Sequence, residues 1–142
     1  MEELLVCVLL LCEGFKLADE YQSKLEALFM LNPDDELLLE LEFMSSDIKG
    51  SCLYLKAHFN YTHFDTERFG RFLMQQLAIL YQQNSLQDFA KKMYSLWQNL
   101  PSNISNVEPF WTLCYADDPL SWGDEKQCQD LYEAMLNYYS CK

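Results

Sequence analysis

Basic residues are scarce in this chain: its 142 residues include 10 Lys and Arg against 22 Asp and Glu, a formal net charge of −12. A field of this sign repels the phosphates of nucleic acids and the head groups of anionic lipids. We therefore expect neither a nucleic acid nor a membrane as a partner. Half of the residues are hydrophobic and 15% are aromatic, so the chain is expected to fold and to carry its acids outside a packed body.

Glycine and proline are also scarce, with four of each. With so few interruptions, hydrophobic residues spaced three and four positions apart predict helix nearly everywhere. The sequence predicts an all-α fold, a single domain over residues 1–142 with six to eight helices, arranged as an irregular bundle or a short α-solenoid-like array. Residues 48–59 are ambiguous, because their run of Cys, Leu, Tyr and Leu is also compatible with a strand.

Particular residues predict where helices begin, end and pack. Gly14 is placed to close the first helix, Asn32 to cap a helix whose first residue is Pro33, and Asp124 to cap the last helix. Gly70 falls inside a long predicted helix, where glycine lowers helix propensity by about 1 kcal/mol relative to alanine. We therefore expect another helix to pack closely against it.

A membrane span and an export signal are not predicted. Residues 4–12 are all apolar, but as a helix they would cover only about 14 Å of a hydrocarbon core roughly 30 Å thick. Glu2 and Glu3 stand where a signal peptide carries basic residues, and no small-residue cleavage site follows. We expect a buried first helix, a cytoplasmic protein, and free thiols at Cys7, Cys12, Cys52, Cys114, Cys128 and Cys141.

Motifs for catalysis and cofactor binding are lacking. The cysteines show no paired Cys-x-x-Cys spacing, and no glycine-rich loop is present to hold a phosphate, so we expect no metal and no cofactor. His63 and Asp65 could act as a general base and its carboxylate in a hydrolase, but no nucleophile accompanies them at a known spacing. The alternative is a turn histidine beside a helix cap, and we expect no enzyme.

Residues 110–125 are the segment most typical of a binding surface, because aromatic side chains and carboxylates are concentrated there. We predict that its carboxylates pair with Arg and Lys of a partner, with Trp122 as an apolar anchor; the acids are Asp117, Asp118, Asp124 and Glu125. Two alternatives remain. Trp111 and Tyr115 could belong to the core, and Asp117 and Asp124 could end one helix and cap the next.

A second acidic patch lies at Asp34, Asp35 and Glu36. Carboxylates are favourable at helix N-termini, where they face the positive end of the peptide dipoles. This patch is therefore explained by helix stability without any partner.

In size, charge, helicity and the acidic loop of residues 115–125, the chain resembles the small, acidic, mostly helical immunity proteins that bacteria make to neutralise basic toxins, often nucleases. The resemblance is one of general character over the whole chain. It implies a tight complex with a cationic, toxin-like protein, formed through electrostatic steering and held by a few desolvated anchors.

A different class of function stays open. The chain could be a structural or regulatory helical protein that assembles with itself through aromatic surface near Trp97, Trp111 and Trp122. A homo-oligomer would then bury these residues.

Overall fold

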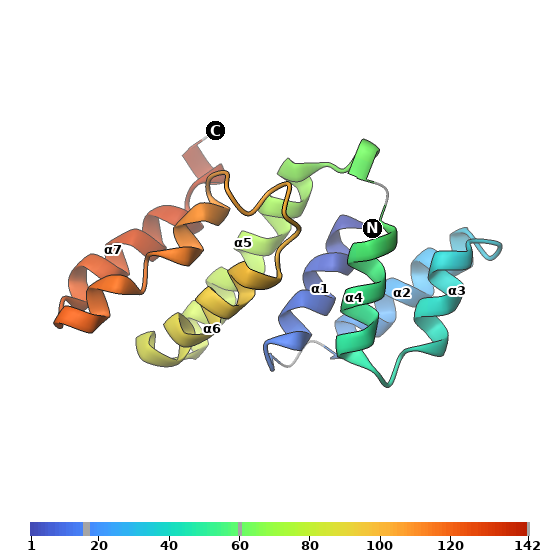
Figure 1. Cartoon of the computed structure of the whole chain (residues 1–142), viewed down its shortest axis with the longest axis horizontal. Helices are drawn as coiled ribbons and strands as arrows, with labels where there is room; N and C mark the ends of the chain where they lie inside the picture. The colour runs from blue at the N-terminus through green and yellow to red at the C-terminus, as the bar shows by residue number, and fades with distance from the viewer. Residues whose placement is uncertain (16–17, 60, 142) are drawn as a thin grey trace. The chain divides into compact units, whose positions relative to one another are not determined.

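The computed structural model of this protein describes residues 1–15, 18–59 and 61–141, without the side chains of Ala18 and Cys141. Within these residues there are seven α-helices, four short 3-10 helices and no strand. The predicted all-α class is thus confirmed. The chain divides into two compact units, Met1–Asp65 and Thr66–Lys142 (Figure 1). A single domain over residues 1–142 stays a prediction.

Four α-helices and one 3-10 helix build the first unit: α1 (Glu2–Cys12), α2 (Ala18–Leu31), α3 (Glu36–Phe43), α4 (Ile48–His58) and η1 (Tyr61–His63). Helix α1 packs against α2 and α4, and α3 packs against the same two helices. Each α-helix therefore has two neighbours, and together the four enclose one apolar interior.

Helix α1 is buried along its apolar run, since every residue from Leu4 to Leu10 is inaccessible to solvent. The predicted buried first helix is confirmed. Its end is closed by Gly14 at a φ of 85°. The Gly14 N–H donates to the Leu11 carbonyl at 3.0 Å and the Phe15 N–H to the Leu10 carbonyl at 3.2 Å, the pair of bonds that defines a Schellman motif. None of the described helices is both long and apolar enough to cross a membrane.

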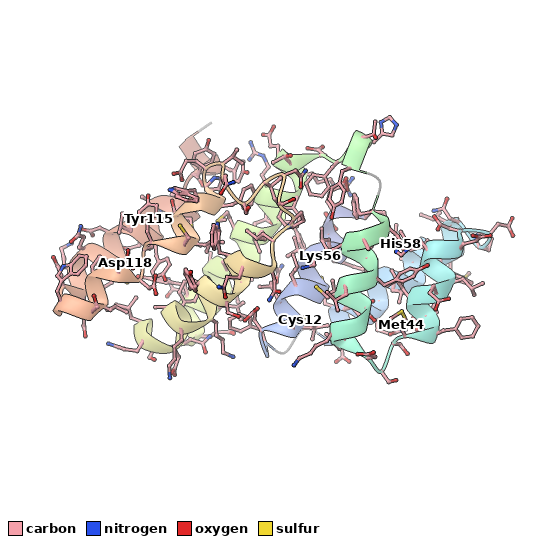
Figure 2. All side chains as sticks on the ribbon, viewed as in Figure 1. Cys12, Met44, Lys56, His58, Tyr115 and Asp118 are labelled. Carbon is pink, nitrogen blue, oxygen red and sulfur yellow. The ribbon has the colours of Figure 1, made fainter. Side chains whose placement is uncertain are left out.

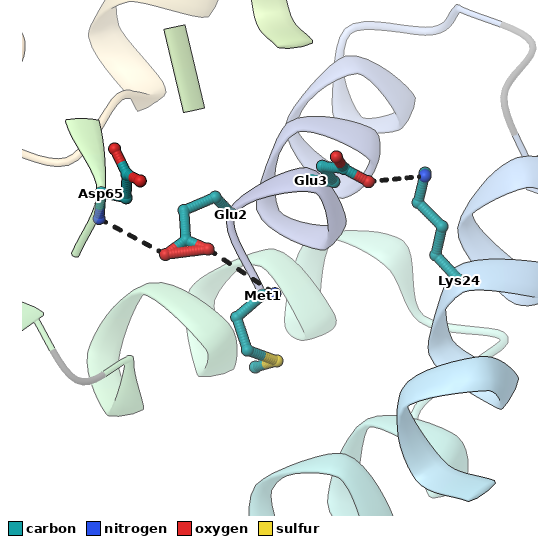
Figure 3. A network of polar contacts seen from close by, with 5 residues as sticks. All are labelled: Met1, Glu2, Glu3, Lys24 and Asp65. Atoms are coloured by element: carbon teal, nitrogen blue, oxygen red, sulfur yellow. Dashed lines mark hydrogen bonds and ion pairs between the residues drawn. The ribbon is translucent and has the colours of Figure 1, made fainter. Parts of the chain in front are cut away.

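The first turn of α1 carries two acids that have partners inside the first unit (Figure 3). Lys24 of α2 donates to Glu3 Oε2 at 2.9 Å, and the Asp65 N–H donates to Glu2 Oε1 at 3.4 Å. These acids are therefore already engaged within the protein.

The predicted cap at Asn32 is wrong, because α3 begins four residues later. Asp35 is the N-cap, and its carboxylate accepts from the N–H groups of Leu37 at 2.9 Å and Leu38 at 3.3 Å. Asn32 instead follows the last turn of α2, where its N–H donates to the Leu28 carbonyl at 3.0 Å. Two good capping residues stand close together here, and the later one begins the helix.

Residues 48–58 form a helix, which settles the ambiguity between helix and strand. Asp47 caps α4, accepting from the Gly50 N–H at 2.9 Å. At the other end of α4, His58 stacks on Tyr54 with ring centroids 4.2 Å apart (Figure 2).

The second unit contains three α-helices and three 3-10 helices: α5 (Thr66–Gln83), α6 (Leu86–Asn99), η2 (Phe110–Cys114), η3 (Asp118–Trp122), α7 (Glu125–Leu136) and η4 (Tyr139–Cys141). One aromatic ring from each α-helix meets in its core. Phe89 lies edge-on to Tyr81 and Tyr132, with ring centroids 5.2 and 5.1 Å apart. These contacts hold α5, α6 and α7 together and so support the segment that precedes α7.

Gly70 is a point of close approach, as its place inside a helix predicts. A Cβ added at Gly70 would collide with the phenol of Tyr139, which follows α7. The Arg71 guanidinium lies 5.3 Å from the centroid of the same ring. The tyrosine ring occupies the space that any larger residue at position 70 would need.

Candidate functional site

The segment before α7 is anchored from its beginning by η2. Phe110 and Leu113 are fully buried, and the Phe110 ring lies 5.7 Å from that of Phe69 on α5. The Thr112 hydroxyl donates to Glu108 Oε2 at 2.8 Å. Because two apolar side chains and one hydrogen-bonded side chain fix this turn, the acidic residues that follow start from a defined position.

Two of the three tryptophans have structural roles. The Trp97 indole N–H donates to the Ser105 carbonyl at 2.7 Å, and its ring meets Trp111 edge-on at 5.7 Å. Trp111 is nevertheless exposed, so the alternative that placed it in the core is wrong. Trp97 is half-buried. The contact between Trp97 and Trp111 packs η2 against the end of α6.

The 3-10 helix η3 presents its acids and its tryptophan on a rigid turn. Pro119 is buried at its start, and Gly123 ends it with a φ of 77°, a conformation that favours glycine. The Asp124 N–H donates to the Pro119 carbonyl at 2.9 Å, which closes the turn. As a result Trp122 is 63% exposed, the most exposed large apolar side chain in the second unit.

Asp124 is the N-cap of α7, as the sequence predicts, with its carboxylate accepting from the Gln127 N–H at 3.0 Å. One of its carboxylate oxygens is therefore engaged within the protein. Glu125 follows at the first helical position and is exposed, and its Oε1 accepts from Gln87 Nε2 at 3.0 Å. Gln87 is neutral, so the charge of Glu125 remains available to a cation.

Asp117 differs from its neighbours. Its Oδ1 is buried and has no hydrogen-bond partner among the described residues, although the residue as a whole is half-buried. Burial raises the pKa of the Asp117 carboxyl above its ordinary value, a hydrogen bond from the backbone N–H of Asp117 itself partly offsets this, and the charge of Asp118 adds to the increase. Asp117 is at the N-cap position of η3 but makes no side-chain cap bond. The free protein therefore holds this carboxylate in a setting that disfavours its charge.

Carboxylates dominate the electrostatics of residues 117–125, which contain four acids and no base. Asp118 is exposed at the start of η3, and it lies with Tyr115 on the segment that leads into α7 (Figure 2). Within the described residues, no lysine or arginine forms an ion pair with any of the four acids. We call this segment the acidic loop: residues 117–125 with Asp117, Asp118, Trp122, Asp124 and Glu125.

Cys128, on α7, has a buried thiol that is influenced by charges of the acidic loop. Burial raises its pKa to about 11, and the nearby charges of Asp117 and Glu125 contribute to the increase. Both carboxylates therefore lie close enough to act on the same buried group. At this pKa the thiol is neutral at pH 7 and is not a nucleophile.

The other candidate groups for chemistry are the cysteines and the pair His63 and Asp65. Among the cysteines whose side chains the structure describes, all five are free thiols, and Cys141 lies outside that description. No group of three or more metal-ligating side chains occurs within the described residues. His63 and Asp65, the pair that the hydrolase hypothesis uses, are both exposed.

Sequence reasoning missed one surface, on the first unit. Leu39 and Phe43 of α3 are exposed, although they stand in a segment rich in leucine. They are separated by four residues and alternate with Glu36 and Glu40, which share their face of the helix. This spacing is visible in the sequence and could have identified the surface.

The fold and the acidic loop thus define an all-α, acidic protein with an exposed tryptophan among unpaired carboxylates. Comparison with protein-family models, with curated proteins and with solved structures finds no match to this chain.

Proposed function

We propose that this chain is a non-enzymatic, acidic protein-binding domain of the immunity or antitoxin kind, which inhibits a basic, toxin-like protein by binding it. The acidic loop makes the contact in this proposal. Asp117, Asp118 and Glu125 face Arg and Lys of the partner, Trp122 fills an apolar site on it, and Asp124 contributes charge while it caps α7.

The single observation that carries the proposal is the buried carboxylate oxygen of Asp117. A carboxyl whose pKa is raised by burial is destabilised in its charged form. Asp117 is half-buried, so a partner can approach the side chain but not its buried Oδ1. A guanidinium or ammonium group near the accessible part of this carboxylate would favour the charged form. The same acid therefore gains more from a cationic partner than a fully solvated acid would.

The exposed groups around Asp117 support the proposal in a second way. Interfaces commonly place an aromatic anchor at their centre and charged groups at their rim. Trp122 supplies the aromatic surface, and Asp118 and Glu125 supply charges that form no ion pair within the part of the chain that the structure describes. Charges of this kind mainly accelerate association, while the buried anchor slows dissociation.

The test is to immobilise the full chain, capture binding proteins at low ionic strength from cells that express it, and measure the affinity of the captured protein for variants. Asp118→Lys combined with Glu125→Lys is expected to weaken binding by roughly a hundredfold. Trp122→Ala is expected to weaken it at least tenfold, as for an interfacial anchor. Asp124 is left unchanged because its loss would also damage α7.

The control is Asp130→Lys combined with Glu133→Lys, which changes the net charge equally and lies on α7, as Glu125 does; it also removes the exposed ion pair between Asp130 and Lys126. It should weaken binding much less than the variant in the acidic loop. Equal losses for the two variants would show a response to net charge alone and would remove the acidic loop from the interface. A captured protein without a basic surface would overturn the proposal.

Self-assembly is the second candidate, and the exposure of Trp122 favours it as well. A stable homo-oligomer would bury that side chain. Light scattering of the purified chain distinguishes the two: a dimer that Trp122→Ala dissociates supports self-assembly, and a monomer supports a different protein as the partner.

A further inference from the structure

A second surface of the protein combines apolar exposure with negative charge. In the first unit, four large apolar side chains are exposed near one helix pair: Met30 by 80%, Leu31 by 78%, Phe43 by 77% and Leu39 by 42%. We call these residues, together with Asp34, Glu36 and Glu40, the α2–α3 face. Single exposed apolar residues need no explanation, but a group of this kind is typical of interaction sites.

The apolar and acidic residues of α3 occupy one side of the helix. Positions 36, 39, 40 and 43 follow the spacing of a helix face, and all four residues are exposed. Leu38 and Leu41 point the other way and are buried. Helix α3 therefore has two apolar sides: one is packed within the first unit, and the other mixes leucine and phenylalanine with two glutamates.

The end of α2 extends this surface. Helix α2 ends at Leu31 and α3 begins at Glu36, so only residues 32–35 connect two helices that pack against each other. This short connection brings Met30 and Leu31 beside the first turn of α3. Asp34 lies within the connection and is exposed. Phe43 lies at the other end of α3, so the face runs along the length of that helix.

The acids of the α2–α3 face determine what can cover it. Within the described residues, Asp34, Glu36 and Glu40 form no ion pair with a lysine or arginine. Residues 1–47 of the sequence contain 12 acids and 2 bases, so their surroundings are negative too. An occupant must therefore provide apolar area and positive charge together.

A second copy of this chain does not provide positive charge. A symmetric dimer brings the same patch of both copies together, which would place one acidic patch against another. Like charges in contact oppose association. An anionic membrane is opposed by the same acids.

We infer that the α2–α3 face is a docking site for a cationic amphipathic helix of another protein, whose apolar side covers Leu39 and Phe43 and whose Lys or Arg residues pair with Glu36 and Glu40. An amphipathic helix meets such a surface with residues at helical spacing. The inference does not rest on the function proposed for the acidic loop, which belongs to the second unit.

The test uses the full chain and a fluorescent peptide of about 18 residues, with Leu and Lys placed so that it forms an amphipathic helix. A scrambled peptide of the same composition keeps the charge and loses the apolar side. Fluorescence anisotropy is expected to give at least tenfold tighter binding for the amphipathic peptide. Equal affinity for the two peptides, or no binding of either, would overturn the inference.

Variants locate the site. Leu39→Ser combined with Phe43→Ser should weaken binding of the amphipathic peptide at least tenfold, and Glu36→Gln combined with Glu40→Gln several-fold. The apolar control is Leu53→Ser, since Leu53 is 65% exposed on α4 of the same unit. The charge controls are Asp118→Asn with Glu125→Gln and Asp130→Asn with Glu133→Gln. All control variants should bind as the wild type does.

Other occupants give different results. Sedimentation that shows a dimer dissociated by Phe43→Ser would assign the surface to a second copy. Binding to neutral phosphatidylcholine vesicles that Phe43→Ser abolishes would assign it to a lipid surface. Peptide binding that is lost in the Asp118 and Glu125 variant but kept in the Leu39 and Phe43 variant would assign the peptide to the acidic loop. Each of these outcomes overturns the inference.

Discussion

The acidic loop and the α2–α3 face both combine carboxylates with exposed apolar side chains, but they use their acids differently. In the acidic loop, Asp124 is engaged in capping α7 and Asp117 is partly buried. On the α2–α3 face all three acids are exposed, and Asp35, which caps α3, is not one of them. The comparison shows that a count of acids does not measure attraction for a partner, because an acid that caps a helix already has backbone N–H partners.

The largest effect expected concerns the two sides of α3. Leu41→Ala should lower the free energy of unfolding by about 2–5 kcal/mol, because Leu41 is fully buried. Phe43→Ala should change it by less than about 0.5 kcal/mol, because Phe43 is 77% exposed. Urea denaturation followed by circular dichroism measures both. A loss of several kcal/mol for Phe43→Ala would mean that this residue supports the core and is not a free surface.

A smaller effect separates capping acids from free acids. Asp124→Ala should cost about 1 kcal/mol of stability, since the Gln127 N–H loses its acceptor. Glu125→Ala should cost less than about 0.5 kcal/mol. The same comparison can be made on α3. Asp35→Ala removes the capping acid and should cost about 1 kcal/mol of stability, whereas Glu36→Ala should cost less than about 0.5 kcal/mol. Urea denaturation measures these free energies of unfolding. Equal losses for the two substitutions of a pair would contradict the distinction between a capping acid and an exposed acid.

The smallest effect concerns the pH dependence contributed by Asp117. Its pKa is raised in the folded protein, so the folded state binds its proton more tightly than the unfolded state does. This contribution favours folding below the unfolded pKa and is lost as pH rises through the folded pKa. We expect Asp117→Asn to gain stability relative to the wild type as pH rises from about 3 to 7.

Unfolding by urea at a series of pH values measures that difference. Asp34→Asn is the control, because Asp34 is exposed and, unlike Asp118, does not contribute to the raised pKa of Asp117. A difference between Asp117→Asn and the wild type that does not grow with pH would show that the Asp117 carboxylate is well solvated. The acidic loop would then be no different in kind from the exposed acids of the α2–α3 face.

The features that sequence analysis predicted correctly are local ones. Gly14 ends α1 and Asp124 begins α7 because the reasons lie in a few consecutive residues: a positive φ in one case and a nearby N–H group in the other. The all-α class follows from hydrophobic spacing over the whole chain. The sequence predicted that another part of the chain packs closely against Gly70. It did not identify that part as Tyr139, which is distant in sequence.

The features that were missed depend on packing. Asn32 and Asp35 are both good capping residues, and the choice between them depends on where α2 ends. The exposure of Phe43 depends on which side of α3 meets its neighbours. The buried oxygen of Asp117 depends on what surrounds the loop, and no local pattern in the sequence encodes it. For the candidate site, the sequence could indicate the segment but not which of its acids are free.

The measurement that tests the central claim most directly is the association rate of the captured partner as a function of ionic strength. Stopped-flow mixing with the wild type should give fast association that slows steeply as salt is added. Asp118→Lys combined with Glu125→Lys should slow association at low salt and flatten the dependence of the association rate on ionic strength. Asp130→Lys combined with Glu133→Lys should retain most of that dependence. Identical salt dependence for the wild type and the variant in the acidic loop would contradict the claim that unpaired carboxylates there attract a cationic partner.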